Sequence, residues 1–195
     1  MKSVRLVLLD RDGALVEDVP DNADPDRVRP LPGAREALGL LRAHGLHTGV
    51  VTRQPGVARG LLSQADLRRV DERIDDLLGP FDVWAVCPHD PDGDCHCRAP
   101  RPGLVLWAAG RVCTPPERIA VIAATADTAE AAHRAGAHGI LLPTPGTRPE
   151  ETAAADHVAP DLLTAVRGLL TGGPTQRVLA DEREIAAAFR PTEKP

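Results

Sequence analysis

Apolar residues follow two alternating patterns along most of this 195-residue chain. Short continuous runs rich in Val, Ile and Leu are typical of strands buried on both faces of a parallel sheet. Such runs occur at residues 4–9, 46–51, 83–86, 119–123 and 139–142. Stretches with helical spacing of apolar residues lie between them, at residues 33–44, 66–78, 103–109 and 126–135. This alternation predicts an α/β fold with a doubly wound (Rossmann-like) parallel sheet.

The last part of the pattern defines the expected end of the domain. A short strand at residues 157–159 and a closing helix at 161–170 precede the chain-breaking run Gly172-Gly173-Pro174. We therefore predict one domain at residues 1–170, a size sufficient for a well-buried core. Residues 171–195 are predicted to form a C-terminal tail with a short helix near 178–189.

Composition excludes several classes of partner. The formal charge is −5 and only 2% of residues are aromatic, so the chain offers neither a basic stripe nor stacking platforms for nucleic acid. The first apolar run, residues 4–9, is too short for a secretory signal or a membrane span. We expect a cytoplasmic protein with no nucleic-acid and no membrane partner.

Three of the 4 cysteines and a histidine lie close together in the sequence. Cys87, His89, Cys95 and Cys97 have the spacing Cys-x-His-x5-Cys-x-Cys, which offers three thiolates and an imidazole to one zinc ion. Cysteines without metal and a disulfide network are the alternatives, but thiols stay reduced in a cytoplasm. The spacing favours a structural zinc loop, with Cys113 left as an ordinary thiol.

Candidate catalytic and phosphate-binding residues lie at the ends of the first two predicted strands. Asp10 and Asp12 come directly after the first strand, and Thr52 ends the second. Ligands bind at the carboxyl ends of the strands in such sheets. There, one carboxylate could attack phosphorus while the other transfers a proton, and the hydroxyl could hold phosphate oxygens. Taken alone, the two aspartates could equally cap a turn.

Taken together, these segments resemble the haloacid dehalogenase (HAD) superfamily. The residues that carry the resemblance are Asp10-Arg11-Asp12-Gly13, the stretch 51–60, the helix start at 32–38 and the segment 87–103. Within the superfamily they are similar to subfamily IIIA, the zinc-loop branch with heptose 1,7-bisphosphate and histidinol-phosphate phosphatases. The resemblance covers roughly residues 4–170 and implies a HAD-like fold without a separate cap domain.

The resemblance also implies roles for individual residues. Asp10 would be the nucleophile that forms an aspartyl-phosphate, and Asp12 the general acid and base. Both would hold Mg²⁺. Thr52 would bind the phosphate, and Arg98 would contact the substrate or its phosphate. Arg53 stands where the family has asparagine, and we add it as a further candidate for phosphate binding. A small phosphorylated sugar is the expected substrate, with heptose bisphosphate favoured over histidinol phosphate.

The chain departs from the pattern of this branch at four positions. Ala14 replaces a threonine, and Ala99 replaces the lysine that steadies the charge on nucleophile and phosphate. Ala124 and Thr128 replace two aspartates after the fourth strand, the first of which is a magnesium ligand. A register shifted by one makes Asp127 the second aspartate but still loses the first.

Two readings of the function follow. The first is a slow or divergent phosphatase, in which Arg53 or Arg101 supplies the missing positive charge. The second is a pseudophosphatase that keeps the fold and the zinc site and binds a phosphorylated ligand or a protein partner. Retained zinc ligands beside altered catalytic positions favour the second reading, and the Asp10–Asp12 pair favours the first.

Overall fold

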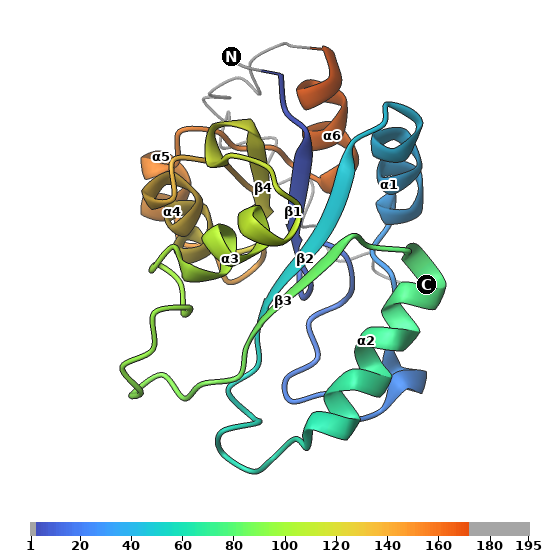
Figure 1. Cartoon of the computed structure of the whole chain (residues 1–195), viewed down its shortest axis with the longest axis vertical. Helices are drawn as coiled ribbons and strands as arrows, with labels where there is room; N and C mark the ends of the chain where they lie inside the picture. The colour runs from blue at the N-terminus through green and yellow to red at the C-terminus, as the bar shows by residue number, and fades with distance from the viewer. Residues whose placement is uncertain (1–2, 172–195) are drawn as a thin grey trace, which may run out of the picture.

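The computed structural model describes residues 3–171 and contains a five-stranded parallel sheet (Figure 1). Its strands run in the order β3-β2-β1-β4-β5. They are β1 (Leu6–Asp10), β2 (His47–Arg53), β3 (Val83–Cys87), β4 (Ile119–Ala123) and β5 (His138–Leu141). All residues of β1 and β4 are buried, as their unbroken apolar sequences predict. The predicted doubly wound α/β fold is confirmed.

Helices cover both faces of the sheet (Figure 1). On one face lie α1 (Ala34–Ala43), α2 (Gln64–Leu78) and α6 (Leu162–Thr171). On the other face lie α3 (Gly103–Arg111) and α4 (Ala126–Arg134), and α5 (Pro149–Ala154) is beside α4. Each face has its own apolar cluster, and both clusters include side chains of β1. The central strand is therefore fixed from both sides.

Most element bounds differ from the predicted ones by one or two residues. Helix α2 begins two residues early because Ser63 and Asp66 form a reciprocal capping box at its start. The predicted strand at 157–159 is wrong in extent, since only an isolated bridge between Leu141 and Val158 forms there. Helix α5 was not predicted, as its six residues are too few to show helical periodicity. The predicted tail helix near 178–189 lies outside the described residues.

Parallel pairing brings the carboxyl ends of four strands to one edge of the sheet. Asp10 pairs with Val51, and Arg53 pairs with Cys87. The ends of β1, β2 and β3 are therefore adjacent, and β4 flanks β1 on its other side. Residues 3–171 contain no cap domain over this edge, and none of their helices is long and apolar enough to cross a membrane. Two short 3-10 turns, Pro25–Arg27 and Pro116–Arg118, lie in the connections.

Candidate active site and zinc loop

Asp10 ends β1 and points toward the start of α4. Its Oδ2 accepts a hydrogen bond of 2.9 Å from the backbone N–H of Ala124, and its Oδ1 accepts one of 3.4 Å from Thr128 Oγ1. Gly13 lies against the side chain of Ala124: a Cβ at Gly13 would be 2.9 Å from the Cβ of Ala124, and the φ of +82° at Gly13 is one that side chains disfavour. The candidate nucleophile is thus held on both oxygens.

Burial makes the charged form of Asp10 unfavourable. Burial raises its pKa from 3.8 to about 7. The N–H of Ala124, the charge of Arg53 and the hydroxyl of Thr128 all lower that pKa, in this order, but do not offset the burial. A buried carboxyl group with a pKa near neutrality among other polar side chains is typical of a functional site.

Asp12 lies beside Asp10 but makes different contacts. Arg11 Nε donates to both of its oxygens at 3.1 Å, Gln54 Nε2 donates to its Oδ2 at 3.0 Å, and Thr52 Oγ1 donates at 3.3 Å. Arg11 is almost fully buried and also pairs with Asp71 of α2 at 2.9 Å. These donors fix the orientation of the carboxyl group of Asp12.

Sequence reasoning missed two of these residues. In the sequence Arg11 lies between two aspartates, and its ion-pair partner Asp71 is 60 positions away, so nothing local indicates a buried ion pair. In the sequence Gln54 is one residue of the stretch 51–60 and has no distinctive spacing. In the structure it donates to Asp12 and, at 2.8 Å, to Thr52 Oγ1, and so reinforces the contact between the ends of β1 and β2.

The arginines predicted near the site separate into different places. Arg53 Nη2 donates to Thr125 Oγ1 at 3.3 Å, and its Nη1 lies 3.5 Å from Asp127 Oδ2, both next to the segment that holds Asp10. Arg101 instead turns to the zinc loop, where it bonds the carbonyl of Cys95 and pairs with Asp94 at 2.8 Å.

Arg98 directly follows the last cysteine of the loop. Its Nη1 is buried and has no hydrogen-bond partner among the described residues. Buried guanidinium nitrogens are almost always hydrogen-bonded, so an orphan of this kind points to a ligand that is recognised there. An anionic oxygen is the acceptor that suits a guanidinium.

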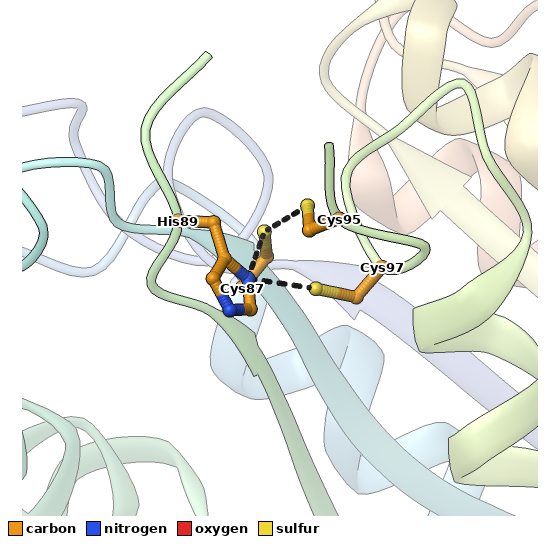
Figure 2. Close-up of side chains that lie close together, drawn as sticks. All are labelled: Cys87, His89, Cys95 and Cys97. Atoms are coloured by element: carbon orange, nitrogen blue, oxygen red, sulfur yellow. Dashed lines mark hydrogen bonds between the residues drawn. The ribbon is translucent and has the colours of Figure 1, made fainter. Parts of the chain in front are cut away.

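The four zinc-ligand candidates converge after β3 (Figure 2). Their donor atoms all lie within 4.8 Å of one another. The Sγ atoms of Cys87 and Cys95 are 3.8 Å apart, and His89 Nδ1 lies 3.7 Å from Cys87 Sγ and 3.2 Å from Cys97 Sγ. Zinc bonds of about 2.0–2.3 Å in a tetrahedron give separations close to these. The donor set fits a closed, structural zinc site.

Burial, followed by the neighbouring thiols of Cys87 and Cys95, raises the pKa of Cys97 to about 12. A bound cation such as zinc stabilises thiolates that lie this close together. Cys113 is exposed and lies apart from the cluster.

Several contacts tie the zinc loop to the candidate active site. The N–H of Gln54 donates to the carbonyl of Cys87 at 2.8 Å, and Arg59 pairs with Asp90 at 2.6 Å. On the other side, Gly103 lets α3 pack so closely that a Cβ there would overlap the carbonyl of His96. Gln54 therefore connects the end of β3, which carries the first cysteine of the zinc loop, to Asp12.

The residues at Asp10 do not fit a resident magnesium ion. Mg²⁺ is usually held by one or two carboxylates with phosphate and water. Here the side chain at position 124 is a methyl group, so no second carboxylate lies beside Asp10 at the end of β4, and the carboxylate of Asp12 is engaged by Arg11 and Gln54. Within residues 3–171, three or more His, Cys, Asp or Glu side chains converge in the Cys–His cluster, and no such group lies at Asp10.

A cavity of about 530 Å³ lies elsewhere, between α4, β5 and α5. Its walls include Glu130, His133 and Asp156, and none of the candidate site residues contributes to it. We therefore place the site at the sheet edge, where the carboxylates and arginines meet, and not in this cavity.

Comparison with known proteins assigns the chain to a class. A HAD-hydrolase-like family model matches residues 96–165. A D,D-heptose 1,7-bisphosphate phosphatase from B. bronchiseptica, solved in complex with magnesium and phosphate, superposes with a TM-score of 0.74 at 28% identity, over 87% of this chain and 100% of that one. With the fold and the Asp10–Asp12 pair, these matches define a HAD-like hydrolase.

Sequence relatives narrow the class further. The D-glycero-beta-D-manno-heptose-1,7-bisphosphate 7-phosphatase of Pseudomonas putida is 31% identical over 152 residues, 72% of this chain and 83% of that protein. The D-glycero-alpha-D-manno-heptose-1,7-bisphosphate 7-phosphatase of Mycobacterium tuberculosis is 40% identical over 115 residues, 54% of this chain and 58% of that protein. The chain belongs to the heptose-bisphosphate phosphatase family within the HAD-like hydrolases. The chain spans less than two thirds of the length of several relatives in this family, including the one from Mycobacterium tuberculosis.

Proposed function

We propose that this chain is a phosphatase that removes one phosphate from a sugar bisphosphate of the heptose 1,7-bisphosphate type. The observation that carries the proposal is the pair Asp10 and Asp12 at the carboxyl end of β1: Asp10 is buried with its pKa raised to about 7, and Asp12 is oriented by hydrogen bonds from Arg11 and Gln54. Environments that separate two neighbouring carboxyls in this way suit them to different catalytic tasks.

In the proposed reaction an oxygen of Asp10 attacks the phosphorus atom. The phosphorus–oxygen bond to the sugar breaks, Asp12 gives a proton to the departing sugar oxygen, and an aspartyl-phosphate remains. Water then attacks this phosphorus, Asp12 takes the proton from the water, and inorganic phosphate leaves with Asp10 restored. Thr52, whose hydroxyl lies beside Asp12, would bind phosphate oxygens throughout.

A second phosphate on the substrate explains the orphan nitrogen of Arg98. Since Nη1 of Arg98 is buried without a partner, an anionic group at the far end of the substrate would satisfy it. The relatives named above act on bisphosphates of both the alpha and beta heptose series. These features support a bisphosphate substrate, and the anomer stays open.

A second candidate function rests on a specific observation. Ala99 and Ala124 carry no charge where lysine and aspartate are expected, and Thr128 offers Asp10 only a hydroxyl. A pseudophosphatase that binds a phosphorylated ligand or a protein partner would have the same zinc loop and the same alanines. The double variant A99K/A124D separates the two, because a large gain of turnover in it would mark the parent chain as catalytically impaired.

The direct test is phosphate release from a panel of sugar monophosphates and bisphosphates. We expect turnover on bisphosphates by the zinc-loaded protein, and none by its Asp10→Asn variant. No release above that of the variant, in a folded protein that contains zinc, would leave the binding function as the answer.

A further inference from the structure

The guanidinium group of Arg53 is linked to Asp10 through two threonine hydroxyls. Arg53 Nη2 donates to Thr125 Oγ1 at 3.3 Å, Thr125 Oγ1 and Thr128 Oγ1 are 3.0 Å apart, and Thr128 Oγ1 donates to Asp10 Oδ1 at 3.4 Å. This relay brings a permanent cation to the nucleophile from the adjacent strand. The charge of Arg53 is close enough to lower the pKa of Asp10.

The contacts of Arg53 are weak enough to be exchanged for a ligand. Its two bonds, to Thr125 and Asp127, measure 3.3 and 3.5 Å, longer than usual charge-assisted hydrogen bonds of about 2.7–2.9 Å. Asp127 is more than half exposed, so this ion pair contributes little. A phosphate dianion would offer the guanidinium two better acceptors in a planar, bidentate arrangement.

Arg11 and Arg101 already have partners, and Arg98 is assigned above to the second phosphate. Arg11 is buried between Asp12 and Asp71, and Arg101 is held by Asp94 and the carbonyl of Cys95 in the zinc loop. Arg98 belongs to that loop as well. This distribution singles out Arg53, rather than Arg101, as the cation that faces Asp10.

We propose that the site binds the transferable phosphate through Arg53 in place of a resident divalent cation, so that phosphate recognition does not require magnesium. This inference rests on the proposed function and deepens it. It also accounts for the ligand set described above, in which position 124 supplies a backbone N–H, and no carboxylate, to Asp10. Two anions in contact repel strongly unless a cation lies nearby, and Arg53 provides one that cannot dissociate.

Binding of inorganic phosphate to the whole zinc-loaded chain tests the proposal. Calorimetric titration would be done in magnesium-free buffer without a strong chelator, so that the zinc loop stays loaded, and then repeated with millimolar magnesium. We expect the two dissociation constants to agree within about threefold, a difference of less than 1 kcal/mol. Binding that appears only with magnesium would overturn the proposal.

Variants give the second arm of the test. Arg53→Gln should weaken phosphate binding about tenfold or more, Arg53→Lys should restore part of it, and Arg101→Gln should leave it unchanged. Thermal melts of each variant check the fold, and partial rescue by lysine would identify the charge as the cause. Equal affinity in the Arg53→Gln and Arg101→Gln variants would contradict the proposed role.

Phosphate release by the same preparations separates this inference from the proposed function. Turnover that depends on both Asp10 and magnesium would leave the phosphatase assignment intact and overturn the role of Arg53. Neither phosphate binding nor turnover under any condition would overturn both.

Discussion

Asp10 combines a buried position with a charge that the proposed chemistry needs. Its two neighbours in space, Ala124 and Thr128, are more than 110 positions away in the sequence and offer only an N–H and a hydroxyl. The sequence pattern was sufficient to place Asp10, Asp12 and Thr52 at one sheet edge, because strand ends in a parallel sheet coincide. It could not assign the partner of Arg53, since Thr125 is 72 residues away and its side chain has no distinctive spacing.

The first prediction concerns the stability of Asp10→Asn. A carboxyl group whose pKa is raised from 3.8 to about 7 on folding binds protons more tightly in the folded state. The wild type therefore loses stability as pH rises from about 4 to about 7, and the loss is complete above 7. Asn keeps the acceptor for Ala124 but has no charge to bury, so the variant should be more stable above pH 7 by up to a few kcal/mol.

Urea unfolding at pH 8 and at pH 4 would measure this difference. The stability gain of Asp10→Asn should be large at pH 8 and small at pH 4. An equal effect at both values would mean that the ionised form of Asp10 carries no folding cost.

The second prediction concerns Arg98. Its buried Nη1 has no partner among the described residues, so Arg98→Gln should leave the melting temperature nearly unchanged. If this nitrogen binds the second phosphate, the variant should raise KM for a bisphosphate about tenfold and affect a matching monophosphate much less. Steady-state kinetics on the two substrates would check this. An equal rise of KM for both would show that Arg98 does not bind the second phosphate.

At the scale of elements, the zinc loop connects β3 to α3 and is fastened to the loop after β2. The ligand spacing was readable from the sequence because Cys87 to Cys97 forms one local segment. Its attachment was not, since the Arg59–Asp90 pair joins segments 31 residues apart. Helix α5 could not be predicted for a different reason: its six residues are contiguous in the sequence but too few to show helical periodicity.

The third prediction is that one zinc ion binds in this loop. Cys95→Ser should lose the metal, whereas Cys113→Ser, which changes an exposed cysteine outside the cluster, should keep about one zinc per chain. Metal analysis of both variants under reducing conditions gives the comparison. Zinc retained by the Cys95→Ser protein would contradict the four-ligand site.

Loss of zinc should also reach the neighbouring site. Because Gln54 bonds both the zinc-loop strand end and Asp12, we expect the Cys95→Ser chain to lose turnover as well as melting temperature. The Cys113→Ser chain should match the wild type in both measurements. A metal-free loop with full turnover would show that the zinc site acts independently of the catalytic edge.

At the scale of the whole molecule, the fold places the carboxyl groups of Asp10 and Asp12, the guanidinium group of Arg53 and the zinc loop around one edge of the sheet. No domain among the described residues covers this edge, which leaves it accessible to a small phosphorylated sugar. Its architecture was predictable from the alternation of apolar runs, whereas its charge balance depends on long-range contacts of Arg11 and Arg53. The altered positions 99 and 124 are therefore compatible with a working, if divergent, site.

The measurement that tests this account most directly is phosphate release from heptose 1,7-bisphosphate by the zinc-loaded chain in the presence of magnesium, beside its Asp10→Asn variant. The account predicts release by the wild type and none by the variant. Release that is equal in the two proteins, or absent from both while each is folded and contains zinc, would contradict it.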